Sequence, residues 1–91
     1  MALHLKFKVL DPVGLYATPT TELVNTVKQF SSHFHLHFER KEVNLKSLMG
    51  VLSLGVPTNA DLEISIEGPD EQQAYNAIKD KINELKISSI E

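Results

Sequence analysis

Residues of three kinds in this 91-residue sequence could carry chemistry. A loop from Gly14 to Pro19 precedes an apolar segment of helical period, and free backbone amides at a helix N-terminus favour an anion such as phosphate. Ser47 precedes a second, short apolar segment. Three histidines alternate with apolar residues along residues 33–38. The chemistries to consider are phosphate binding, modification of a hydroxyl and metal ligation.

The loop before the first predicted helix lacks a residue suited to phosphate transfer. Tyr16 offers a phenol, a residue type that is protonated at neutral pH, and Thr18 carries no charge. No general base adjoins either residue in the sequence. The simpler interpretation is a turn and a helix cap, with Thr18 as the cap and Pro19 as the first helical residue.

Ser47 has a structural and a functional interpretation. A serine at a helix N-cap accepts a hydrogen bond from an amide one turn further on. Residues 48–54 include five large apolar side chains, which is more than one buried stripe holds, so part of this helix should be exposed. Phosphorylation of Ser47 would add about two negative charges beside that part. The predicted partner surface comprises Leu48, Met49, Leu52, Lys46 and Thr20.

The histidines at positions 33, 35 and 37 point to one face of a predicted strand, roughly 7 Å apart at each step. Neighbouring strands offer carboxylates such as Glu63 and Glu67 but no cysteine, and a closed metal site needs four ligands at fixed angles. We therefore interpret His33, His35 and His37 as residues of the wet face of an open sheet. We expect no metal, no cofactor and no catalytic base among them.

The composition describes one small domain of 10.2 kDa with a formal charge of −3. The absence of cysteine from the sequence excludes disulfides, thiolate metal sites and cysteine nucleophiles. The nine lysines and arginines are scattered, which argues against a nucleic-acid surface. Without a long apolar stretch, we expect a soluble, cytoplasmic chain. Its size favours a carrier, binding module or regulator over an enzyme.

Hydrophobic periodicity predicts the element order βαββαβα. The strands are predicted over residues 3–9, 33–38, 42–45 and 61–67, and the helices over 19–30, 47–55 and 71–85. Because each strand is apolar on one side only, we predict an α+β fold, an open-faced sandwich with a four-stranded antiparallel sheet and three helices on one face. We assign residues 1–91 to a single domain and expect a frayed tail at 86–91.

The segment from Val43 to Gly55 resembles the regulatory-serine segment of the HPr family, the histidine-containing phosphocarriers of the bacterial phosphoenolpyruvate-dependent sugar phosphotransferase system. The resemblance extends from about Leu5 to Leu85. The family's active loop, Gly-Ile/Leu-His-Ala-Arg-Pro, is matched in part by Gly14, Leu15, Ala17 and Pro19. The resemblance implies an open-faced βαββαβα fold, in agreement with the periodicity.

This sequence departs from the family at two positions that carry its chemistry. Tyr16 stands where the family has its phosphorylated histidine, and Thr18 stands where it has a supporting arginine. A phosphotyrosine ester is too stable for ready transfer, and the missing guanidinium removes a bidentate phosphate ligand. We therefore predict that the protein does not carry out histidine phosphotransfer.

The combination of a lost histidine and a retained serine resembles the Crh-type branch of the family, in which glutamine is the usual replacement for the histidine. That resemblance implies phosphorylation of Ser47 by the HPr kinase/phosphorylase. It also implies binding of the phosphoprotein to a LacI-type catabolite control repressor, with Met49 and Leu52 in the docking surface. Thr18 removes an arginine that helps the family to contact this repressor.

Two alternatives remain open. The protein could be an atypical phosphocarrier of the phosphotransferase system that uses Tyr16 or a strand histidine as acceptor. It could also be a diverged copy that docks on a partner without being modified, in which case the apolar surface would matter and the Ser47 hydroxyl would not.

Overall fold

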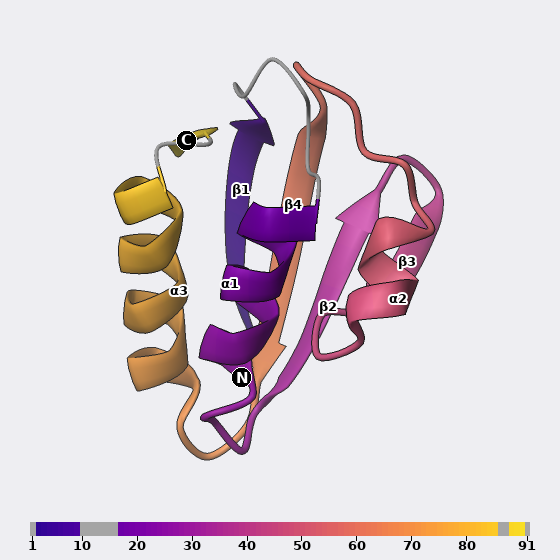
Figure 1. The fold of residues 1–91 in the computed structure, drawn as a ribbon. Coiled ribbons are helices and arrows are strands. Elements are labelled where there is room, and N and C mark those ends of the chain that lie inside the picture. The colour runs from indigo at the N-terminus through magenta and orange to yellow at the C-terminus, as the bar shows by residue number, and fades with distance from the viewer. Residues whose placement is uncertain (1, 10–16, 86–87, 91) are drawn as a thin grey trace.

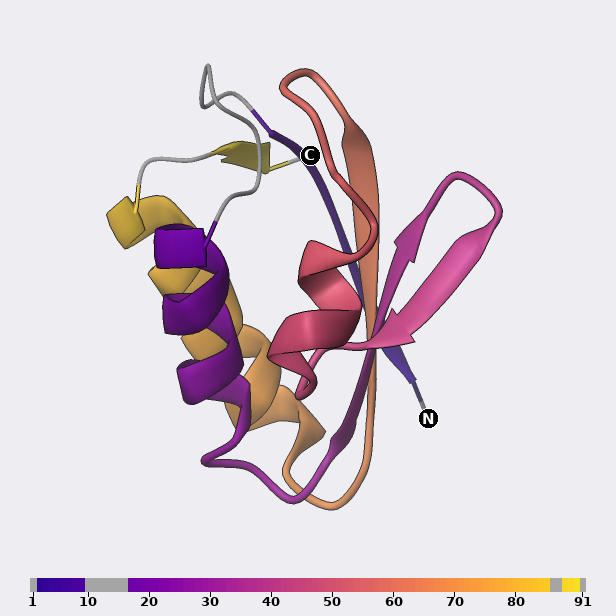
Figure 2. The same cartoon turned by 45° about the vertical axis from the view of Figure 1, so that its right-hand side comes forward.

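A computed structural model describes residues 2–9, 17–85 and 88–90 of the chain as one sheet with three helices packed on one of its faces (Figure 1). Seen along the sheet, all three helices lie on the same side (Figure 2). The elements are β1 (Leu3–Val9), α1 (Ala17–Val27), β2 (His33–Phe38), β3 (Lys41–Asn44), α2 (Leu48–Leu52), β4 (Asp61–Glu67), α3 (Glu71–Leu85) and β5 (Ser88–Ile90). The predicted open-faced α+β sandwich is confirmed.

The sheet is antiparallel and has the strand order β3-β2-β4-β1-β5. Within the described residues, the sheet has five strands where four are predicted: β1, β2, β3 and β4 are the four that periodicity predicts, and β5 is the additional one. The expected fraying of the C-terminal end is wrong for residues 88–90, because β5 pairs with β1 and places Ile90 opposite Phe7. This pairing gives hydrogen-bond partners to a strand edge of β1 that would otherwise need them.

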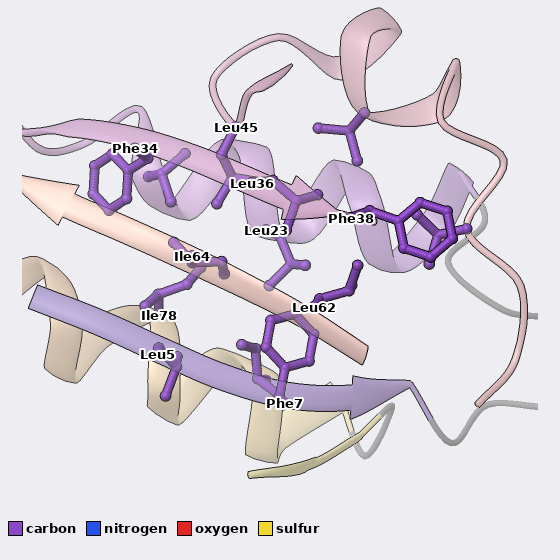
Figure 3. Packing of buried hydrophobic residues seen from close by; sticks show 14 of the residues in the cluster. Leu5, Phe7, Leu23, Phe34, Leu36, Phe38, Leu45, Leu62, Ile64 and Ile78 are labelled. Carbon is purple, nitrogen blue, oxygen red and sulfur yellow. The ribbon is translucent and has the colours of Figure 1, made fainter. Parts of the chain in front are cut away.

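The core lies between the sheet and the helices (Figure 3). Burial follows the period-two pattern of each strand: in β1 the side chains of Leu5, Phe7 and Val9 are buried, and the residues between them point to the other face. β2 and β4 repeat this pattern with six further buried side chains. The helices contribute buried residues at helical spacing, namely Leu23, Val24 and Val27 from α1 and Ala74, Ile78 and Ile82 from α3.

None of the helices in the described ranges is long and apolar enough to cross a membrane.

Hydrogen bonds to Asp70 link the turn before β2 to the start of α3. Its carboxylate accepts hydrogen bonds from the backbone N–H of Ser31 at 2.8 Å and of Ser32 at 2.9 Å, and from the Ser32 hydroxyl. The Ser32 hydroxyl, followed by the Ser31 amide, lowers the pKa of Asp70 below its usual value. The ionised carboxylate is therefore the form that the folded protein favours.

We expect Asp70→Asn to destabilise the protein in a pH-dependent way. Because the folded-state pKa of Asp70 is lowered, its ionisation stabilises the fold above the unfolded-state pKa of about 3.9. This contribution is lost as the pH falls through the folded-state value. Urea unfolding between about pH 6 and about pH 2 should show the stability difference between wild type and Asp70→Asn shrinking in acid. A difference that stays constant over this range would contradict the role of the charge.

Candidate functional site

Ser47 lies at the start of α2, in the N-cap position that its sequence context predicts. Its backbone is extended, with φ −103° and ψ 106°, and its Oγ accepts a hydrogen bond from the N–H of Gly50 at 3.2 Å. The Ser47 carbonyl accepts from Val51 N at 3.1 Å, so this residue opens the helix. The side chain remains exposed to solvent. The hydroxyl therefore caps the helix and stays accessible to a modifying enzyme.

Met49 is the one large hydrophobic residue that is exposed within the described part of the chain, with 76% of its surface accessible. Leu48 and Leu52 are half-buried, whereas Val51 points into the core. α2 is only five residues long, so its core-facing side is filled by few residues and the remaining apolar side chains face outward. We call Leu48, Met49 and Leu52 the α2 surface.

Lys46 is less available to a partner than the sequence suggested. Its Nζ donates a hydrogen bond to the carbonyl oxygen of Phe30 at 2.8 Å, and lies 5.7 Å from the centroid of the Phe34 ring. The half-buried side chain thus links the loop before α2 to the turn after α1. The ammonium group of Lys46 is therefore bound to a carbonyl of the same protein. The α2 surface itself is apolar.

Thr20 corrects the predicted partner surface, because its side chain is fully buried. It lies on α1 three, four and seven residues before Leu23, Val24 and Val27, so it belongs to the helix face that packs on the sheet. The buried hydroxyl has no hydrogen-bond partner within the described ranges. Thr20 is therefore a packing residue in this structure, and the α2 surface does not include it.

The predicted anion site of the loop lies outside the described residues, since Tyr16 is not among them. Thr18 is described, and its exposed side chain belongs to the first turn of α1, which already includes Ala17. The prediction that Thr18 caps this helix is therefore wrong by one or more positions, which is the usual scatter of sequence-based helix ends.

Gly50 lies beside the Ser47 hydroxyl and is not among the predicted site residues. A Cβ atom at this position would lie 3.1 Å from the Oγ of Ser47 and 3.7 Å from the Cβ of Val43. The missing side chain therefore leaves room beside the Ser47 hydroxyl. The available signal was the spacing, because a residue three positions after an N-cap serine faces that serine.

We expect Gly50→Ala to slow phosphorylation of Ser47 while changing stability little. The added methyl crowds the Ser47 hydroxyl, but alanine favours a helix over glycine by about 1 kcal/mol, which offsets the crowding. The rate of phosphate incorporation from ATP, measured beside a thermal melt, checks both effects. An unchanged rate would show that the space beside the hydroxyl is irrelevant to the modifying enzyme.

The predicted histidine face is the side of the sheet opposite the helices. His33 and His35 are exposed there, and His37 is half-buried. Within residues 2–9, 17–85 and 88–90, no group of three or more histidine or carboxylate side chains is placed to hold a metal ion. His4 of β1 shares this face, because it pairs with Ser65 of β4 and alternates with the buried residues of its strand.

The fold and the site define a class: a small open-faced α+β sandwich with a capping, accessible serine beside an exposed apolar side chain. The sequence model of the family described as "PTS HPr component phosphorylation site" matches residues 4–84. This chain belongs to the HPr family of the sugar phosphotransferase system.

Solved structures from the same family agree with this assignment. The histidine-containing phosphocarrier protein of Mycoplasma is 30% identical, with a TM-score of 0.91 over 93% of this chain and 97% of that one. The phosphocarrier protein HPr of Bacillus anthracis is 29% identical, with a TM-score of 0.79 over 88% and 95% of the two chains. Crh, the catabolite repression protein of Bacillus subtilis, is 34% identical, with a TM-score of 0.69 over 85% and 84%.

Proposed function

We propose that this protein is a Crh-like regulator of carbon catabolite control, switched by phosphorylation of Ser47 and not competent for histidine phosphotransfer. The observation that carries the proposal is the accessible Ser47 hydroxyl at the start of α2, two residues from the exposed Met49. The departures at Tyr16 and Thr18 support its second half, since neither residue can take over from an imidazole or a guanidinium.

The switch would act through local charge. A phosphate on Ser47 keeps oxygens that can accept the Gly50 N–H, so α2 need not unfold when the group is added. About two negative charges would then stand beside the α2 surface. Because the Lys46 ammonium is already bound to the Phe30 carbonyl, we expect these charges to be available to a partner's cations. A partner with a basic rim and an apolar centre would bind the phosphorylated form preferentially.

The proposed partners follow from the family resemblance. The HPr kinase/phosphorylase would modify Ser47 in the cytoplasm, and a LacI-type catabolite control repressor would bind the product. Thr18 is exposed on α1 and presents no guanidinium, so this protein would contact the repressor with one cationic group fewer than other family members.

Two phosphate donors test the proposal. We expect an HPr kinase with labelled ATP to label the wild type and Ser53→Ala but not Ser47→Ala. Ser53 is the matched control, because it is an exposed serine at the other end of α2 whose hydroxyl bonds to the Gly50 carbonyl. Labelled phosphoenolpyruvate with the first enzyme of the phosphotransferase system should give no label.

Two results would contradict the proposal. Label from ATP that persists in Ser47→Ala would place the modification elsewhere. Label from phosphoenolpyruvate would revive the atypical phosphocarrier, and its loss in Tyr16→Phe would identify the acceptor.

A second candidate, docking without modification, is favoured by the exposure of Met49 in the unphosphorylated protein. The two candidates differ in what they expect of Ser47→Ala. The regulator loses partner capture with this substitution, whereas the unmodified docking module keeps it.

A further inference from the structure

Three polar side chains from three adjacent strands form a line across the helix-free side of the sheet, the side turned away from the helices in Figure 2. The Nε2 of His37 lies 2.9 Å from the Oγ of Ser65. The Nδ1 of the same ring lies 3.3 Å from a carboxylate oxygen of Glu42. The His37–Ser65 contact is a hydrogen bond, whereas the His37–Glu42 contact is a charge contact. A carboxylate, an imidazole and a hydroxyl in this order are the groups that activate a serine for nucleophilic attack.

The surroundings support one assignment of the protons. With the proton of the neutral ring on Nδ1, the nitrogen nearer to the Glu42 carboxylate, the Nε2 of His37 is free to accept the Ser65 proton. On the other side, the Nδ1 of His4 lies 3.0 Å from Glu63 and 3.3 Å from the Ser65 oxygen, so it can act as a donor to both. His37, Ser65, His4 and Glu63 then each have a hydrogen-bond partner of the complementary kind.

We propose that Ser65 is a nucleophilic hydroxyl that accepts an acyl group from activated esters, with His37 as general base and Glu42 as a positioning residue. In this step the Ser65 oxygen attacks the ester carbonyl carbon while its proton passes to Nε2 of His37. The bond to the leaving alkoxide or phenoxide then breaks, and the proton on His37 passes to it. The products are the Ser65 ester and the free alcohol or phenol, with no oxidant or cofactor required.

Local charge favours an acyl donor over a phosphoryl donor. A hollow of about 390 Å³ reaches His37 and is also lined by Lys6, Glu39, Asp61 and Glu63. Lys6 and Lys8 lie 4.0 Å and 3.8 Å from Glu63 and Asp61, so these lysines are already paired with carboxylates. This arrangement disfavours a phosphate, which needs free cationic ligands for transfer. The hollow is lined by His37 and not by Ser65, so it bears on the reaction through the charge near the general base, which favours esters that are uncharged or carry a positive charge.

The sheet limits this reactivity to esters with good leaving groups. Ser65 is paired with His4 of β1 on one side and with His35 of β2 on the other, so the strand backbone around it is engaged in the sheet. Backbone donors for an oxyanion are therefore not free at this point, and the loss of one such donor costs about 10²–10³ in rate. This proposal does not depend on Ser47 or the α2 surface, which belong to another part of the fold.

The test uses 4-nitrophenyl acetate as the acyl donor and peptide mapping by mass spectrometry as the readout. We expect acetylation of Ser65 in the wild type, no acetylation at that position in Ser65→Ala, and a rate at least about tenfold lower in His37→Gln. His35→Gln is the matched control, because His35 is an exposed histidine of the same strand and face without a polar partner in the described ranges. Thermal melts establish that each variant is folded.

Three outcomes would overturn the proposal. Acetyl groups found only on lysines or histidines would show that Ser65 is inert. Equal acetylation rates for the wild type and a folded His37→Gln variant would show that His37 is not the general base. If Ser65 were phosphorylated by 4-nitrophenyl phosphate and not acetylated by 4-nitrophenyl acetate, its group donors would be phosphate esters and not acyl esters.

The positioning role of Glu42 is tested by a measurement that a purely structural contribution to folding would leave unchanged. Nitrogen chemical shifts of the His37 ring report which nitrogen carries the proton. We expect protonated Nδ1 and bare Nε2 in the wild type, and a mixture of the two tautomers in Glu42→Ala. The same mixture in both proteins would exclude a positioning role for Glu42.

Discussion

Replacement of Met49 by glutamate is expected to weaken partner capture at least about tenfold and to leave the stability of the protein unchanged within about 0.5 kcal/mol. Met49 is exposed, so its loss removes little packing from the core. A carboxylate at this position would have to be desolvated without a partner at the centre of an apolar contact. Affinity of the phosphorylated protein for the repressor, measured by calorimetry, checks the first effect, and a urea melt checks the second.

Asn25→Glu is the matched control for Met49→Glu, because Asn25 is an exposed residue of α1 outside the α2 surface. It introduces the same charge and should change affinity little. Equal loss of affinity in both variants would show that net charge is responsible. Unchanged affinity in Met49→Glu would show that the α2 surface is not the docking surface.

Gly68→Ala is expected to lower the free energy of unfolding by about 3 kcal/mol. A Cβ atom at position 68 would lie 2.6 Å from the Cα of Ser32, closer than real Cβ contacts, and the residue has φ +154°. The opposing atom belongs to the backbone of a fully buried residue that is itself held by Asp70. The two turns can separate only if the hydrogen bonds to Asp70 lengthen.

Gly55→Ala provides the comparison for this effect. Gly55 also has a positive φ, +61°, but a Cβ atom there would meet nothing within 4 Å. Its replacement should therefore cost about 1 kcal/mol, from backbone conformation alone. Equal losses in the two variants, measured by urea unfolding, would mean that the contact with Ser32 is not what makes Gly68 necessary.

The strands could be predicted from the sequence because alternation fixes both their existence and their buried face. In β4 the residues Leu62, Ile64 and Ile66 are buried and the polar residues between them are not, as the period-two pattern requires. Ser47 could be predicted for a similar reason, since capping is a local property of residues 47–50.

The misplaced residues depend on contacts between segments far apart in the sequence. β5 forms because β1 offers it an edge, and residues 88–90 alone are too short to carry a periodic signal. Lys46 is bound to a carbonyl sixteen positions away. The neighbours of Ser65 on the sheet, His4 and His37, can be identified only once the pairing registers of β1, β2 and β4 are known.

Thr20 is a different case, because its burial could have been read from the sequence. Its spacing to Leu23, Val24 and Val27 is that of a helix face, and a threonine can occupy such a face among apolar residues. The spacing of Thr20 therefore predicts a packing residue of α1, as the structure shows.

Mass spectrometry of the protein isolated from the cells that express it tests the central claim most directly. Cells grown on a rapidly used sugar and cells on a poor carbon source should be compared under conditions that preserve phosphohistidine. The regulatory account predicts a single phosphate on Ser47 during growth on the rapidly used sugar, and less of it on the poor source. A phosphate on Tyr16 or on a histidine, or an unmodified Ser47 under both conditions, would contradict it.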